Sequence, residues 1–189
     1  EALIHPDFDE MLSVADNRKR EVILTTNGML LHKHIDSICE HVDVLAVSLE
    51  GIGKVNDDIR IGGSFCEVES NILELMGRDK RPKVYVCLTI STQTREQISE
   101  FVNHWESKVD VVRTKPMFDD ELKVVDESLY AGVKPQTLCD FPFSFLGIFW
   151  NGDVTTCCAD LNGINIFDNL SGKNIYDIWK GGENEESTV

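Results

Sequence analysis

Cysteines in the last third of the chain have the type and spacing to bind an inorganic centre. Cys139 and Cys157 flank a glycine in the pattern Cys139-x12-Gly152-x4-Cys157. A β-hairpin predicted between them would carry the chain out and back, so that the two thiols meet at its base. Paired thiolates bind a soft metal or an iron–sulfur cluster. The alternative is that these are buried structural cysteines, because two or three cysteines cannot complete a four-thiolate site.

The predicted hairpin has strands at 145–150 and 153–157, joined by a two-residue type I′ turn at Asn151-Gly152. Cys158 follows Cys157 directly and would point to the other face of the strand. The cysteines at positions 39, 66 and 87 each stand alone and are predicted to pack as small hydrophobic residues.

Hydrophobic periodicity predicts the elements that must position this site. The expected strands are 21–28, 43–51, 83–90 and 109–113. A helix opens at Pro6 and ends near 18–20, and further helices are expected at 30–41, 64–76, 94–105 and 175–180. Ser64 with Glu67 predicts a capping box at the start of the 64–76 helix.

Helices that alternate with strands imply an α/β fold with a parallel sheet and right-handed crossovers. The strands are continuously apolar, which predicts that helices or other strands cover both faces of the sheet. Ligands of such sheets bind at the carboxyl ends of the strands. The residues expected there are 26–28, 48–51, 89–91 and 113–115.

The whole chain resembles the radical S-adenosylmethionine (SAM) enzymes that carry a C-terminal SPASM or twitch extension. The pattern of Cys139, Gly152 and Cys157 is similar to the start of the cluster-binding motif of that extension. Glu1 resembles the last residue of the family's Gly-Gly-Glu motif. The other stretches that resemble the family are 2–7, 25–28, 47–51, 166–170 and 175–181.

The resemblance implies a partial (β/α) barrel, as in a partial TIM barrel, with a small C-terminal hairpin and helix extension. Residues 1–117 would be the central and C-terminal part of the barrel, 118–138 an acidic connector, and 139–189 the SPASM/twitch-like extension. The Cys-x3-Cys-x2-Cys loop that holds the SAM-cleaving 4Fe-4S cluster is expected before the first residue. Later cysteines of the extension are expected beyond the last one, so that the chain would be a fragment, inactive alone.

Roles in SAM binding also follow from the resemblance. Glu1 would meet the SAM amino group through a charge-assisted hydrogen bond. Ser48 and Arg60 would hold the SAM carboxylate, since a hydroxyl and a guanidinium both suit an anion. Asn27 and Glu50, at strand ends, would face SAM or the substrate.

Roles in the extension follow in the same way. Cys139 and Cys157 would bind an auxiliary iron–sulfur cluster. In sulfatase-maturing relatives an acidic residue follows the second of these cysteines and serves as a base. Here Cys158 occupies that position and Asp160 comes two residues later. Cys158 would donate a hydrogen atom, act as a ligand or simply pack, and Asp160 is the alternative base.

The predicted function is therefore part of a radical SAM oxidoreductase or maturase. The intact enzyme would cleave SAM reductively and abstract a hydrogen atom from a peptide or small-molecule substrate, with electrons from a flavodoxin or ferredoxin. One alternative is a non-catalytic α/β binding module with a small metal-stabilised appendage. Another is a metal-free hydrolase or aldolase in which Lys115 forms a Schiff base.

Composition excludes several other functions. The formal net charge is −15, which disfavours nucleic acid and anionic membranes as partners. No apolar stretch approaches the roughly 20 residues of a membrane span, and a cytoplasmic location is predicted. Gly51 and Gly53 do not make a dinucleotide-binding loop, because Asn56 stands where the third glycine is needed.

Overall fold

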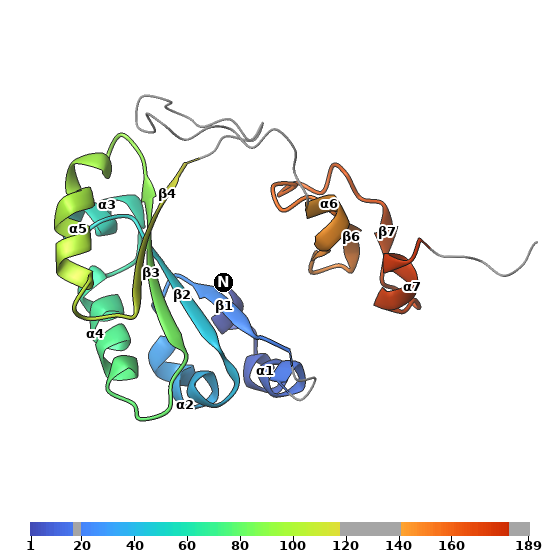
Figure 1. The fold of residues 1–189 in the computed structure, drawn as a ribbon, viewed down its shortest axis with the longest axis horizontal. Coiled ribbons are helices and arrows are strands. Elements are labelled where there is room, and N and C mark those ends of the chain that lie inside the picture. Colours follow the sequence, from blue (N-terminus) through green and yellow to red (C-terminus); the bar gives the residue numbers. More distant parts are fainter. Residues whose placement is uncertain (17–19, 118–140, 182–189) are drawn as a thin grey trace, which may run out of the picture. The chain divides into compact units, whose positions relative to one another are not determined.

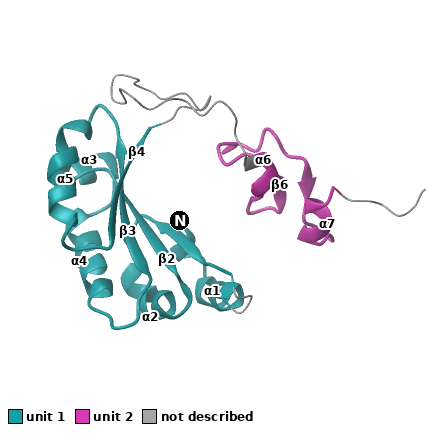
Figure 2. Ribbon diagram, viewed as in Figure 1, with its two compact units in different colours: residues 1–119, 123–131 teal, residues 120–122, 132–189 magenta. Residues whose placement is uncertain are grey.

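The structure is a computed structural model that describes residues 1–16, 20–117 and 141–181. The chain divides into two compact units, residues 1–119 with 123–131 and residues 120–122 with 132–189 (Figure 2). The first contains η1 (Ala2–Ile4), α1 (Phe8–Asp16), β1 (Ile23–Thr26), α2 (Leu31–His41), β2 (Val44–Leu49), α3 (Lys54–Ile59), α4 (Phe65–Met76), β3 (Lys83–Ile90), η2 (Arg95–Gln97), α5 (Ile98–Trp105) and β4 (Val111–Pro116).

The described strands of the first unit form one parallel sheet in the order β1-β2-β3-β4 (Figure 1). This confirms the α/β class and the parallel sheet predicted from the alternating periodicity. The last strand begins two residues later than expected and runs on to Pro116. Helix α3 was not predicted, because its six residues are too few to show a clear helical period.

Helices cover one face of this sheet and form the core with it. Figure 1 shows α4 and α5 along one side of β3 and β4. Phe101 and Trp105 of α5 are fully buried in the cluster that includes the inward residues of the strands. Burial of each such large side chain stabilises the fold by about 1.5–3 kcal/mol. The buried strand residues are Leu24, Leu45, Val47, Leu49, Val84, Val86 and Leu88.

The opposite face of the sheet is only half-covered, so the expectation of two covered faces is wrong within the described residues. Buried positions alternate with half-exposed ones along β2 and β3. The half-exposed positions include Ser48 and Cys87, whose side chains bury little apolar surface. The sequence did not reveal this alternation, because residues on the half-covered face, such as Ala46 and Tyr85, are also hydrophobic.

Local signals place the ends of α4 and β1. The Ser64 hydroxyl accepts a hydrogen bond from the Glu67 N–H at 3.3 Å, which confirms Ser64 as the N-cap of α4. After β1 the chain turns at Gly28, whose φ is 84°. A Cβ there would lie 2.7 Å from a methyl carbon of Val68 on α4, so only glycine allows this turn to pack against the helix.

The second unit contains a small antiparallel sheet in the order β5-β6-β7. The predicted hairpin is present, but its turn differs: the Phe149 N–H donates to the Asp153 carbonyl and the Gly152 N–H donates to the Phe149 carbonyl, both at 2.9 Å. The loop therefore has three residues, with Gly152 at φ 88°. The elements are α6 (Phe141–Ser144), β5 (Gly147–Ile148), β6 (Asp153–Thr155), β7 (Asp168–Asn169) and α7 (Ile175–Trp179).

None of the helices in the described part of the chain combines the length and the hydrophobicity needed to cross a bilayer.

Candidate functional site

The carboxyl end of β1 is joined to the first residue of the chain. Glu1 Oε1 accepts a hydrogen bond from the Thr26 hydroxyl at 2.7 Å, and Oε2 accepts one from the Asn27 N–H at 2.9 Å. Oε1 also accepts from the Leu3 N–H at 3.3 Å. A carboxylate has about four acceptor positions, so Glu1, which is exposed, keeps capacity for one further donor.

Asn27 forms the turn that follows β1. Its Oδ1 accepts a hydrogen bond from the Met29 N–H at 3.0 Å, which uses the side-chain oxygen locally. The structure thus brings Glu1 and Asn27 together at the carboxyl end of β1. The role of Thr26 as the donor that anchors Glu1 was not predicted, although Thr26 was expected at the carboxyl end of a strand. A ligand contact of Asn27 stays a prediction.

Glu50 and Arg60 meet at the carboxyl end of β2. Arg60 Nη2 donates to Glu50 Oε1 at 3.0 Å, and both side chains are largely shielded from solvent. The Glu50 N–H donates to Asn56 Oδ1 at 3.0 Å, and Asn56 is only 1% exposed. Asn56 therefore supports the strand end that carries Glu50. No sequence signal pointed to this role of Asn56, apart from the absence of a glycine at that position.

The Arg60 guanidinium is left with an unused donor. Its Nε is buried and has no hydrogen-bond partner within the described residues. A buried N–H without an acceptor costs free energy, typically about 1–3 kcal/mol. An anionic group bound beside Arg60 would supply the missing acceptor. The buried Arg60 Nε, which has no acceptor among the described residues, therefore fits a ligand with a carboxylate, such as an amino acid.

Ser48 lies on the half-covered face of β2, two residues before Glu50. It pairs in register with Cys87 of β3. In the part of the chain that the structure describes, no interaction joins Ser48 to Arg60. The structure therefore places both at the carboxyl end of β2 without bringing them into contact, and their shared role in holding a carboxylate stays a prediction.

In the second unit, Cys157 and Cys158 lie in the loop just after β6 rather than within a strand. Cys157 is half-buried and Cys158 is exposed, and both are free thiols. The Cys157 N–H donates to the Thr155 hydroxyl oxygen at 3.2 Å, which ties the loop to the end of β6. The expectation that Cys158 points to the other face of a strand is therefore wrong.

Asp160 organises the same loop. It is 7% exposed, and its oxygens accept hydrogen bonds from the backbone N–H groups of Ile164 and Asn165 at 2.8 Å each. The Thr155 hydroxyl lies 3.3 Å away and donates to Oδ2. Burial raises the pKa of Asp160, but these hydrogen bonds outweigh it and leave that pKa below its usual range. A role for Asp160 as a base stays a prediction.

Cys139 and the predicted connector at 118–138 lie outside the described residues. The distance from Cys139 to Cys157 is therefore untested, as are the predicted domain boundaries. Among the residues that are described, no three His, Cys, Asp or Glu side chains are grouped so as to hold a metal ion. The Cys157 thiol fits one ligand position of a thiolate-bound centre, and the described residues do not complete the set.

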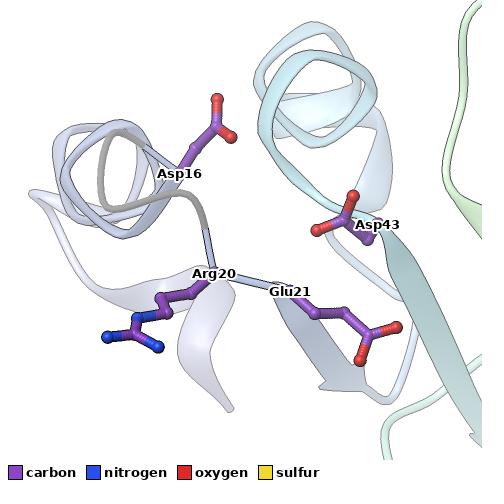
Figure 3. Close-up of a pocket in the computed structure, with 4 residues that line it drawn as sticks. All are labelled: Asp16, Arg20, Glu21 and Asp43. Carbon is purple, nitrogen blue, oxygen red and sulfur yellow. The ribbon is translucent and has the colours of Figure 1, made fainter.

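A shallow pocket lies at the other end of the sheet. It is lined by Asp16, Arg20, Glu21 and Asp43 (Figure 3). Glu21 and Asp43 come just before β1 and β2, so the pocket is at the amino ends of the strands. Figure 3 shows the Arg20 side chain pointing away from the Glu21 and Asp43 carboxylates. Since ligands of parallel sheets bind at the carboxyl ends, this pocket is not the candidate site.

Comparison with known proteins supports the assignment of the second unit. Residues 139–187 match the SPASM family, an iron–sulfur cluster-binding domain. No curated protein sequence matches the chain significantly.

Solved structures share the fold of nearly the whole chain. SuiB from Streptococcus suis, crystallised with S-adenosylmethionine, superposes with a TM-score of 0.72 at 18% identity, over 95% of this chain and 52% of the SuiB chain. SuiB bound to its precursor peptide SuiA gives 0.65 at 15% identity, over 95% and 52%. A domain of the pyruvate-formate lyase-activating enzyme from Bacteroides vulgatus ATCC 8482 gives 0.52 at 14% identity, over 69% of this chain and 84% of that domain.

These findings agree with the resemblance recognised in the sequence: the chain shares its fold with SuiB over 95% of its length, and residues 139–187 match the SPASM family model. The chain spans about half the length of SuiB.

Proposed function

We propose that this chain is part of a radical SAM enzyme of the oxidoreductase or maturase type, with an auxiliary iron–sulfur cluster in its SPASM domain. The observation that carries the proposal is that residues 139–187 match the SPASM family. These residues follow a parallel sheet whose fold is shared with SuiB. The intact enzyme cleaves SAM reductively and abstracts a hydrogen atom from its substrate.

Side chains at the carboxyl ends of β1 and β2 suit the amino-acid part of SAM. Glu1 is anchored by Thr26 and Asn27 and accepts a hydrogen bond from the SAM ammonium group. Arg60, whose Nε has no hydrogen-bond partner among the described residues, donates to the SAM carboxylate together with Ser48. When bound with a reduced 4Fe-4S cluster, SAM supplies the radical that removes the substrate hydrogen. These residues orient SAM and exclude water.

Cys157 and Cys139 bind the auxiliary cluster in this proposal. The Asp160 loop holds Cys157 at the end of β6, while the exposed Cys158 is accessible to substrate. The SuiB complex with its precursor peptide supports a peptide substrate, although a small molecule remains the alternative. The electron donor, a flavodoxin or ferredoxin, and a cytoplasmic location are predictions that accompany this function.

The test is iron and acid-labile sulfide analysis of the full-length protein, purified without oxygen, together with detection of 5′-deoxyadenosine after addition of SAM and dithionite. We expect iron, sulfide and SAM cleavage. Colourless protein that contains zinc but no iron would instead support the non-catalytic binding module.

The ligand assignment is tested by replacing both Cys139 and Cys157 with serine. Iron and sulfide should fall by the content of one cluster, because serine does not replace a thiolate in binding soft iron–sulfur centres. Cys66→Ser is the matched control, since Cys66 is exposed on α4 and should leave the iron content unchanged. Unchanged iron in the double variant would show that the assigned ligands are wrong.

A further inference from the structure

Two cationic side chains lie side by side on the half-covered face of the sheet. In the β3–β4 register, Cys87 pairs with Arg113 and Thr89 pairs with Lys115. Residues two apart in a strand point to the same face, so Arg113 and Lys115 share the face of Cys87. Both charges act on the Cys87 thiol: burial raises the pKa of Cys87, and the two cations partly oppose that rise.

Arg113 is turned inward over the sheet. Its guanidinium carbon lies 4.3 Å from the centre of the Tyr85 ring on β3, in a cation–π contact. Basic residues on an edge strand often serve only to block pairing with another chain. A guanidinium stacked over the neighbouring strand is poorly placed for that purpose, because it covers the face of the sheet rather than its edge.

Among the described residues, these cations also lack the carboxylate partners that several other basic side chains have. Arg60, Arg81 and Lys108 form ion pairs with Glu50, Asp110 and Glu69. Within the described ranges, neither Arg113 nor Lys115 forms an ion pair, and both are exposed. The chain has 33 acidic and 18 basic residues, so two neighbouring cations without an ion pair among the described residues differ from the charge of the rest of the chain.

We propose that Arg113 and Lys115 form an anion subsite that binds a carboxylate of an acidic peptide substrate. A guanidinium held on Tyr85 keeps its N–H edges free to donate two hydrogen bonds to a carboxylate, and the Lys115 ammonium adds a third donor. The proposal rests on the proposed function, since it names the substrate class of the same site.

The subsite is distinct from the place where SAM is expected. Ser48, Cys87 and Arg113 form one row across β2, β3 and β4. Adjacent strands are about 4.8 Å apart, so the row puts Arg113 roughly 10 Å from Ser48. A peptide carboxylate bound at Arg113 would therefore lie beside SAM. Because SAM also has a carboxylate that could bind the two cations, the experiment must distinguish the peptide from SAM.

The experiment measures binding of fluorescein-labelled hexaglutamate to the full-length protein by fluorescence polarisation, with hexaglutamine as the uncharged probe. Arg113→Gln/Lys115→Gln removes the subsite. Arg20→Gln/Lys80→Gln is the matched control, because it removes the same charge from exposed positions just before β1 and β3, at the amino ends of the strands. Thermal unfolding of all variants confirms that they are folded.

We expect hexaglutamate to bind and hexaglutamine not to. Loss of two charged hydrogen-bonding partners should weaken hexaglutamate binding about tenfold or more in Arg113→Gln/Lys115→Gln, and less than about twofold in the control. The affinity for SAM, measured by equilibrium dialysis, should not change. Equal weakening in the control, or unchanged peptide binding in the subsite variant, overturns the proposal.

A fall in SAM affinity in Arg113→Gln/Lys115→Gln would assign the two cations to SAM and also overturn it. Peptide binding needs no SAM cleavage, so this result is independent of the iron analysis that tests the proposed function.

Discussion

Asp160 is a buried carboxylate, and its hydrogen bonds within the described part of the chain come from its own loop and from the end of β6. Two backbone N–H groups and the Thr155 hydroxyl donate to it. Thr155 also accepts from the Cys157 N–H, so the loop that carries the proposed cluster ligand is held through these two side chains. This geometry favours a positioning role for Asp160, while its predicted role as a base is left to experiment.

Replacement of Asp160 by asparagine should destabilise the loop. The asparagine amide has one acceptor oxygen in place of two, and its N–H₂ group would face one of the groups that donate to Asp160. We expect the Tm of the full chain to fall by about 3–6 °C. Asp177→Asn on α7 is the control and should change little, since Asp177 is exposed. The measurement is differential scanning fluorimetry. Equal Tm values for the two variants would contradict the role of Asp160 in the loop.

At the scale of elements, Asp110 ties the beginnings of β3 and β4. It accepts two hydrogen bonds from the Arg81 guanidinium, at 2.6 and 3.1 Å, and one from the Val84 N–H at 2.7 Å. The hydrogen bond from Arg81 is the main reason that the pKa of Asp110 lies below its usual value, although burial acts in the opposite direction. These contacts support the register on which the alignment of Arg113 with Cys87 depends.

Because the pKa of Asp110 is lowered by folding, its contribution is present above the unfolded value and is lost as the pH falls through the lower folded value. Asp110→Asn should reduce the free energy of unfolding by about 1–2 kcal/mol at neutral pH. The difference from wild type should shrink as the pH falls below about 3.9, the ordinary pKa of an aspartate. Urea denaturation at neutral pH and at a pH below this value measures the difference in the free energy of unfolding. Asp79→Asn is the control, because Asp79 is exposed. A difference independent of pH would refute the electrostatic explanation.

For the whole molecule, the dominant property is its excess of acidic residues. The formal charge of −15 at pH 7 repels the phosphate backbone, and the two cations Arg113 and Lys115 on the sheet face are far too few to reverse that repulsion. The same charge makes the proposed binding of hexaglutamate a stringent test, since attraction must come from a local site.

This chain should therefore not retard duplex DNA in a mobility-shift assay at about 0.1 M salt, where surface charges still interact over a Debye length of about 10 Å. Retardation that weakens steeply with added salt would contradict the conclusion drawn from composition.

The sequence alone determined the type and order of the main elements. Periodicity showed the strands and helices of the parallel sheet, Ser64 marked the start of α4, and Asn27-Gly28 marked the end of β1, because these signals act between residues close in the chain. The family resemblance carried by Cys139, Gly152 and Cys157 likewise predicted the SPASM extension, and residues 139–187 match that family model.

Only the tertiary structure decided which distant residues meet. Thr26 anchors Glu1 across 25 positions of sequence, and Arg113 stacks on Tyr85 because the β3–β4 register aligns them. The half-covered face of the sheet and the three-residue hairpin loop are also known only from the tertiary structure. Local patterns carry the preference for helix or strand, whereas register, side-chain direction and backbone hydrogen bonding determine which groups a site brings together.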